Sequence, residues 1–283
     1  GIAAIGISFS GVALPLIVDP LLDLVGWRNV YVIFASVVFF IILPLIFFAV
    51  IDDPKIVNQV KDGIKTHKKE EPLPQEITAK DLLSKKVFWM ISLAFAFQFM
   101  SMMGVLAFLP VHASKMGLEE TWYLLGLPVK QYVFAYSLAA FGGVLGKILF
   151  GYLMDIMKAS YPSMMAMFLQ AIGIFGITYF NEPSIFLLSA FIFGLGFGAA
   201  TPLMTACYLR TFGAHNLGKA RGIASPIVSP LQPIGVLVTS ILIGFQDTYF
   251  VAFNIMGCIA LVAVILASQI HEPKKSDQYS TSY

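Results

Sequence analysis

The sequence predicts an all-α membrane protein, and its composition and its apolar segments both lead to this fold class. Of the 283 residues, 58% are hydrophobic and only 12% are charged, whereas soluble domains carry about 25% charged residues. Eight apolar stretches are long enough to cross a bilayer core as helices, which takes about 20 residues each. None of them has the alternating polarity of a membrane-barrel strand. The composition therefore excludes a soluble enzyme, a nucleic-acid binder and a disordered chain.

A single apolar segment in lipid can satisfy its backbone polar groups only as a helix. The linker 52–86 contains eight lysines against seven acidic residues, which favours a solvated link between two bundles over a regulatory segment. At its end, Thr78 as an N-cap with Asp81 three residues later predicts a short surface helix up to Lys86. The eight predicted spans cover residues 1–19, 29–51, 87–112, 131–154, 161–180, 184–209, 222–245 and 248–270.

The basic residues predict the orientation of the chain in the membrane. Fourteen of the 18 Lys and Arg residues fall in one alternating set of links, and the other set holds only Arg28, Lys115 and Lys130. Basic residues gather on the cytoplasmic side, so we expect the linker 52–86 and the C-terminal tail to face the cytoplasm of a plasma or bacterial inner membrane. The remaining basic residue, Lys147, lies inside a predicted span.

The sequence offers no pattern for a metal, a cofactor or a nucleic acid. Cys207 and Cys258 lie in apolar stretches without CxxC or Cys/His spacing. The net charge of +2 gives no strong basic field for nucleic acid. The chain begins at Gly1 without a charged leader, so we interpret it as an excerpt from a longer protein rather than as one with a signal peptide.

Several motifs resemble those of the major facilitator superfamily. The segment 146–155, GKILFGYLMD, resembles the G-[RK]-x-x-x-G-x-L-x-D motif in the eighth helix and following loop of that superfamily. Gly26-Trp27-Arg28 is similar to the loop after its fifth helix. The segment 194–198 resembles its tenth helix, and 218–222 with the proline-rich span after it resembles its eleventh.

The resemblance implies a twelve-helix, two-bundle transporter fold, of which this chain would supply eight transmembrane helices, the fifth to the twelfth. Residues 1–51 would then be the last two helices of the N-terminal bundle, and 52–86 the cytoplasmic linker. Residues 87–270 would form the C-terminal six-helix bundle, and 271–283 a cytoplasmic tail.

Lys147 is the most informative residue for function. It precedes Asp155 by eight positions, which places it about 12 Å from the cytoplasmic helix end. A lysine at helix-centre depth costs about 2.5–3.5 kcal/mol to insert, so it should face a polar cavity or a carboxylate. It either binds an anion or pairs with a structural acidic partner. The monocarboxylate and oxalate/formate exchangers of the superfamily carry a basic residue here, and this similarity implies an organic-anion substrate.

Other polar residues within the spans are candidates for substrate binding, each with a structural alternative. Tyr136 lies eleven residues before Lys147 on the same helix face, or else simply packs against a neighbouring helix. Gln98 and Gln232 lie near the middle of their spans, where buried amides also join neighbouring helices. Thr201 and Thr205 either line the cavity or bond back to their own helix.

A second group of residues predicts conformational roles. Pro226, Pro230 and Pro233 lie in one span, and bent helices often mark binding and gating regions of transporters. Gly151, like Gly142, Gly143 and Gly146, would permit close helix approach and sliding. The resemblance implies that Asp155 latches one half of the transporter to the other.

These observations together predict a secondary active transporter that moves a small organic anion, a carboxylate, by alternating access. A proton or sodium ion would be coupled to the movement, and the lipid bilayer is the other partner. One alternative is a transporter of a neutral solute in which Lys147 is structural. Another is a membrane-embedded enzyme or signalling protein, for which the spans would need converging catalytic side chains, and we find none.

Overall fold

The computed structural model describes residues 2–49, 77–118, 120–124, 127–246 and 248–271. Most of the predicted linker 52–86 and of the tail 271–283 lies outside these residues. The chain divides into two compact units, one made of residues 18–75 and the other of residues 1–17 and 76–283. We describe each unit by itself.

Residues 18–49 of the smaller unit are helical. The helix α1 (Ile2–Val37) continues into a π-helical turn (Val38–Ile42) and then into α2 (Leu43–Ala49). Gly26 interrupts α1 with φ 73° and ψ 160°, a conformation that suits glycine because it has no Cβ. The break separates the two spans that the sequence predicts at 1–19 and 29–51.

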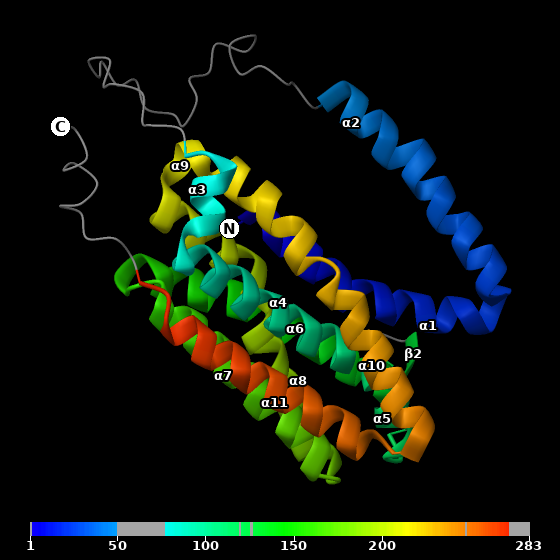
Figure 1. Cartoon of the computed structure of the whole chain (residues 1–283). Helices are drawn as coiled ribbons and strands as arrows, with labels where there is room; N and C mark the ends of the chain where they lie inside the picture. The colour runs from blue at the N-terminus through cyan, green and yellow to red at the C-terminus, as the bar shows by residue number, and fades with distance from the viewer. Residues whose placement is uncertain (1, 50–76, 119, 125–126, 247, 272–283) are drawn as a thin grey trace, which may run out of the picture. The chain divides into compact units, whose positions relative to one another are not determined.

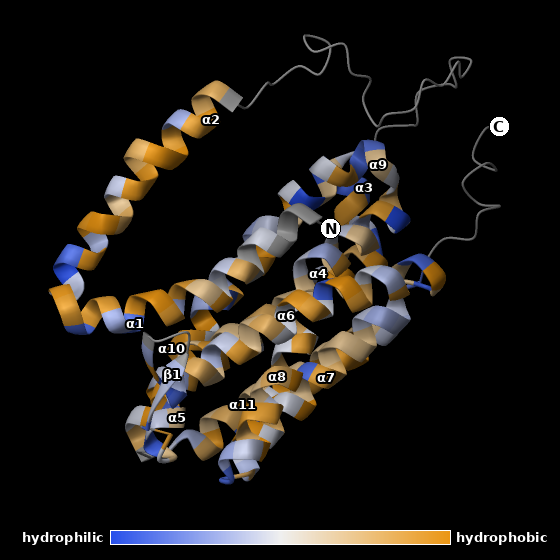
Figure 2. Cartoon of the chain, turned by 180° about the vertical axis from the view of Figure 1, so that it is seen from behind, coloured by the Kyte–Doolittle hydropathy of each residue, from blue (hydrophilic) through white to orange (hydrophobic). Residues whose placement is uncertain are grey.

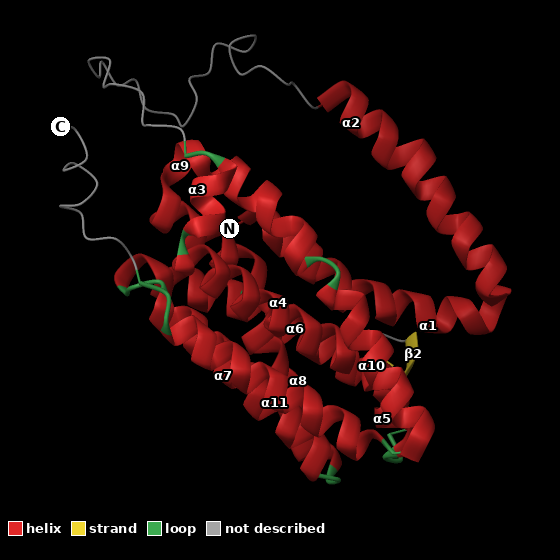
Figure 3. Ribbon diagram, viewed as in Figure 1, coloured by secondary structure: helices red, strands yellow, loops and turns green. Residues whose placement is uncertain are grey.

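The larger unit is a bundle of helices with one small hairpin (Figures 1 and 3). The hairpin consists of β1 (Thr121–Leu124) and β2 (Leu127–Lys130), paired antiparallel with Thr121 opposite Lys130. The helices are α3 (Ala79–Ser84), α4 (Lys86–Leu106), α5 (Leu109–Lys115), α6 (Gln131–Ile156), α7 (Ser160–Tyr179), α8 (Pro183–Gly198), α9 (Ala200–Val228), α10 (Leu231–Gln246) and α11 (Tyr249–Ser268).

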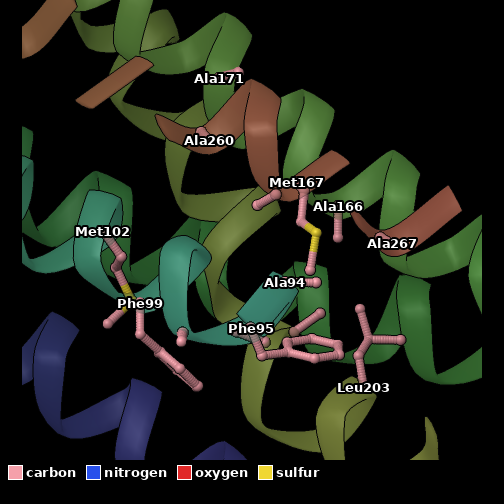
Figure 4. Close-up of a cluster of buried hydrophobic side chains, with 14 of the residues drawn as sticks. Ala94, Phe95, Phe99, Met102, Ala166, Met167, Ala171, Leu203, Ala260 and Ala267 are labelled. Carbon is pink, nitrogen blue, oxygen red and sulfur yellow. The ribbon is translucent and has the colours of Figure 1, made fainter. Parts of the chain in front are cut away.

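The helices of this unit pack in a chain of neighbours, with α6 and α7 each against α8, α11 against α7, and α4 against α11 and α10. Hydrophobic residues make up most of these helices, and the hydrophilic colours gather around α3 and the neighbouring part of α9 (Figure 2). In the core, Phe95 of α4 and Met167 of α7 lie near Leu203 of α9 (Figure 4), and all three are almost fully buried.

The short helix predicted at the end of the linker is confirmed. Thr78 accepts a hydrogen bond from the Asp81 backbone amide at 3.2 Å, and the Asp81 carboxylate accepts one from the Thr78 amide at 3.3 Å. This capping box satisfies two amide groups at the start of α3. The preceding residue, Ile77, bonds to α9 through Asn216 Oδ1 at 3.1 Å and Lys219 Nζ at 3.2 Å.

Within the described residues, six helical segments are long and apolar enough to cross a membrane. One of them, Phe9–Phe48, overlaps two of the predicted spans, and another, Pro183–Phe245, contains two. The eight-helix count and the twelve-helix fold stay predictions. The structure does have several helices that are long and apolar enough to cross a membrane, as the sequence predicts.

The stretch 210–221, which the sequence predicts as a polar link, is helical on both sides of a sharp break at Gly213, with φ 78° and ψ 163°. As at Gly26, the break separates two predicted spans, here 184–209 and 222–245. Most of the link is helical nevertheless, because the polarity that Arg210, Lys219 and Arg221 give it does not by itself stop a helix. The sequence interpretation places a link between the predicted spans 87–112 and 131–154 and makes no prediction of the hairpin of β1 and β2 that the structure has there.

Candidate functional site

Close packing of α6 on α8 sets the direction in which Lys147 points. A Cβ at Gly142 would overlap the carbonyl oxygen of Phe191, and a Cβ at Gly146 would overlap that of Leu195. The two helices therefore approach backbone to backbone, as small residues allow in membranes. Because adjacent helical residues are rotated by about 100°, Lys147 is turned from this contact toward the start of α9.

Lys147 lines a pocket of about 420 Å³ between α6 and α9, which we call the Lys147 pocket. Among the α6 residues that line it, Lys147, Gly151 and Asp155 follow one another at spacings of four and so lie on one face of the helix. The α9 side is apolar apart from its backbone. The lining residues are Lys147, Ile148, Phe150, Gly151, Tyr152, Met154, Asp155, Pro202, Leu203 and Ala206.

The structure thus brings three predicted residues together, Lys147, Gly151 and Asp155. The three residues differ in how far they are buried. Lys147 is half-buried, whereas Asp155 and Gly151 are exposed. A Cβ at Gly151 would meet nothing within 4 Å. Gly151 therefore does not mediate close helix contact in this unit, unlike Gly146. It lines the Lys147 pocket without a side chain.

A second pocket, of about 340 Å³, lies between α4, both halves of α9 and α10, and we call it the Arg221 pocket. It contains two of the predicted residues, Thr201 and Gln232. The break at Gly213 lets both halves of α9 line one space. The lining residues are Phe99, Met102, Met103, Thr201, Met204, Tyr208, Arg221, Ala224, Ser225, Val228, Ser229 and Gln232.

The predicted proline-rich segment borders the Arg221 pocket. Pro226 lies inside α9, which ends at Val228, and α10 begins at Leu231 just after Pro230. Proline lacks the amide hydrogen of a regular helix, so the helix is interrupted at this point. Pro233 follows within the first turn of α10.

Gln98 and Thr205 lie in settings that match their structural alternatives. Gln98 is fully buried and donates from Nε2 to the Gly196 carbonyl at 3.3 Å, while Gln170 donates to the Gln98 carbonyl at 3.1 Å. These bonds join α4 to α8 and α7. Thr205 donates to the carbonyl of Thr201 one turn earlier at 2.9 Å. Neither residue lines the Lys147 pocket or the Arg221 pocket.

Tyr136 lies on α6, half-buried, and is not among the residues that line either pocket. Its predicted place in the wall of the same cavity as Lys147 therefore stays a prediction. Equal rotation around a helix puts two residues on one face, but eleven residues at 1.5 Å separate them by about 16 Å along the axis.

The sequence reasoning missed Arg210 and Arg221, which it counts only as orientation signals in a link. Arg210 donates from Nη1 to the Met157 carbonyl at 2.8 Å and from Nη2 to the Met154 carbonyl. Arg221 lines the second pocket. Residue spacing could have indicated this position of Arg221, because residues 221, 224, 225 and 228 recur at the intervals of one helix face.

The described residues contain no group of three or more His, Cys, Asp or Glu side chains that could hold a metal ion. Several helices are long and apolar enough to cross a membrane, and the Lys147 pocket and the Arg221 pocket, each lined by one basic side chain, lie between helices. These features define the chain as a multi-pass membrane protein with pockets between its helices.

The comparison with protein families agrees with this class. The model of the Major Facilitator Superfamily matches residues 1–231. The chain therefore belongs to the Major Facilitator Superfamily, whose members are membrane transporters of small molecules and not enzymes. No curated protein matches the chain in sequence.

Proposed function

We propose that this transporter moves a small organic anion, a carboxylate, by alternating access, and that Lys147 neutralises the anion. The observation that carries the proposal is that Lys147 lines the Lys147 pocket from a half-buried position between α6 and α9. A lysine at this depth costs about 2.5–3.5 kcal/mol to insert. A carboxylate bound beside its ammonium group offsets that cost.

The shape of the pocket supports a small substrate. A volume of about 420 Å³ falls at the lower end of the range of about 300–1,000 Å³ for small-molecule sites. The walls are apolar on the α9 side, where Pro202, Leu203 and Ala206 lie. An apolar wall lowers the local dielectric constant and strengthens the attraction between Lys147 and an anion.

The proposal also covers the orientation of the chain in the membrane and the conformational change that moves the substrate. The distribution of basic residues supports a cytoplasmic C-terminus in a plasma or bacterial inner membrane. Asp155 near the end of α6 and the prolines around the junction of α9 and α10, Pro226, Pro230 and Pro233, are the positions proposed to take part in the conformational change. A proton or sodium gradient is the expected energy source.

The test is uptake into proteoliposomes that contain the full-length protein. We expect uptake of at least one acid from a panel of acetate, lactate, benzoate and succinate. Lys147→Gln should abolish that uptake, because it removes the charge and keeps a similar length, while Lys147→Arg should retain part of it. Lys158→Gln is the matched control, since Lys158 is exposed and lies outside both pockets.

Two outcomes would contradict the proposal. One is unchanged acid uptake by the Lys147→Gln protein at equal reconstitution. The other is an unaltered protein that transports neutral amides or sugars but none of the acids. The second result would favour a neutral substrate, with Lys147 as a structural charge.

A further inference from the structure

The Arg221 pocket is separate from the Lys147 pocket although the two lie on either side of one helix. They share no lining residue. In the first half of α9, Thr201, Met204 and Tyr208 line the Arg221 pocket, whereas Pro202 and Leu203 line the other. The first turns of α9 therefore form a wall between two spaces.

The polar part of the Arg221 pocket is suited to an anion. Arg221 is the one charged side chain among its lining residues, and the hydroxyl-bearing and amide side chains there are Thr201, Tyr208, Ser225, Ser229 and Gln232. A guanidinium group presents several N–H donors in a plane that matches a carboxylate. The hydroxyl groups of Thr201, Ser225 and Ser229 and the side-chain amide of Gln232 can add further donors. The Tyr208 hydroxyl donates to Ser92 instead, because Ser92 donates to the Phe88 carbonyl.

Tyr208 is held in a defined position at this pocket. Its Oη lies 2.7 Å from Ser92 Oγ of α4, and Ser92 Oγ also donates to the Phe88 carbonyl at 2.7 Å. Tyr208 is fully buried and forms part of the pocket wall. A fixed polar wall reduces the entropy lost when a ligand binds.

The rest of the pocket is apolar and adaptable. Phe99, Met102, Met103, Met204 and Val228 line it from α4 and from both halves of α9. Methionine side chains are flexible and polarizable, so they fit apolar groups of different shapes. The pocket therefore combines one cationic end with a non-polar body.

Gln232 of α10 adds a polar side chain to the pocket, one residue after α10 begins at Leu231. Its backbone amide already donates to the Ser229 carbonyl at 3.3 Å, and the Ile234 amide donates to the Pro230 carbonyl at 3.3 Å. The side-chain amide of Gln232 can donate two further hydrogen bonds to a ligand.

We propose that the Arg221 pocket is a second binding position for an organic anion with a non-polar body. The carboxylate would lie on the Arg221 guanidinium, and the non-polar body would pack on the methionines and Phe99. The inference deepens the proposed function and rests on its anionic substrate, but it concerns a different pocket and a different cation.

The experiment measures equilibrium binding of labelled benzoate to the purified full-length protein, with benzamide as the neutral counterpart. We expect two benzoate sites in the unaltered protein. One should be lost or weakened at least tenfold in Arg221→Gln and the other in Lys147→Gln. Arg221→Lys should retain its site within about tenfold, and Lys158→Gln should retain both. Benzamide binding should be the same in the unaltered and Arg221→Gln proteins.

A second variant keeps the test valid if Arg221→Gln does not fold. Thr201→Phe fills the same pocket and should abolish the same benzoate site. An Arg221→Gln protein that folds and keeps all benzoate binding would overturn the inference, as would an unaltered protein that binds no benzoate. Loss of binding in Arg221→Gln together with unchanged acid uptake in Lys147→Gln would support the Arg221 pocket and overturn the role proposed for Lys147.

Discussion

Arg210 in α9 donates a hydrogen bond of 2.8 Å from Nη1 to the carbonyl oxygen of Met157, immediately after the end of α6. Its Nη2 donates to the carbonyl of Met154. The last carbonyl groups of a helix have no partner within the helix, and a cation there also suits the negative end of the helix dipole. Arg210 thereby anchors the end of α6 on which Asp155 lies.

Replacing Arg210 with Gln should destabilise the protein. Hydrogen bonds to charged groups contribute about 1.5–3 kcal/mol each in mutational series. Because Arg210 is only partly buried, we expect the loss of its two bonds together to lower the free energy of unfolding by about 1.5–3 kcal/mol. Thermal unfolding in detergent measures it. Lys158→Gln, at an exposed position near the same helix end, should change stability by less than about 0.5 kcal/mol. Equal melting temperatures for the two variants would contradict a capping role for Arg210.

Gly146 and Gly151 form a matched pair on α6 for testing helix packing. A methyl group at Gly146 would overlap the carbonyl of Leu195, whereas one at Gly151 would meet nothing within 4 Å. We expect Gly146→Ala to destabilise by about 1–3 kcal/mol. Gly151→Ala should leave stability unchanged or raise it by up to about 1 kcal/mol, because alanine is the better helix former. Chemical unfolding of the two variants side by side measures the difference, and a larger loss for Gly151→Ala would contradict the packing.

The capping box of α3 should make that helix sensitive to acid. The hydrogen bonds from Thr78, first from its side chain and then from its backbone, lower the pKa of Asp81 below its ordinary value. A carboxyl group with a lowered pKa in the folded state stabilises it above the unfolded pKa of about 3.9. This contribution is lost as the pH falls through the folded pKa.

Hydrogen-exchange protection factors of the α3 amides measure this effect. Protection should fall below about pH 4 in the unaltered protein, and Asp81→Asn should remove the part of the pH dependence that is due to Asp81. Thr78→Ala should lower protection at neutral pH by about 1 kcal/mol. If Asp81→Asn left the pH dependence of α3 unaltered, the carboxylate would not be the group that titrates.

Much of the fold was predictable because its causes are local. Apolar length predicts membrane-crossing helices, and the Thr78 and Asp81 spacing predicts the start of α3, which the structure confirms. The helical course of 210–221 was not predictable from polarity, because Arg210 and Lys219 find their partners on other segments, at Met157 and Ile77.

The candidate site divides in the same way. Lys147, Gly151 and Asp155 were predicted and line one pocket because they lie on one face of a single helix. Thr201 and Gln232 were predicted one by one, but their meeting with Arg221 depends on the break at Gly213 and on the contact of α9 with α4. Neither of those follows from any single segment.

By itself, then, the sequence determined that this chain is a multi-pass helical membrane protein with one lysine inside a span. Hydrophobic length and the cost of charge in lipid act on each segment alone, so no tertiary information is needed. Only the tertiary structure decided that the Lys147 pocket and the Arg221 pocket form, that the first turns of α9 separate them, and that Arg221 lines the latter. Such pockets are made by side chains from helices far apart in sequence, whose packing depends on close contacts such as that of Gly146 with Leu195.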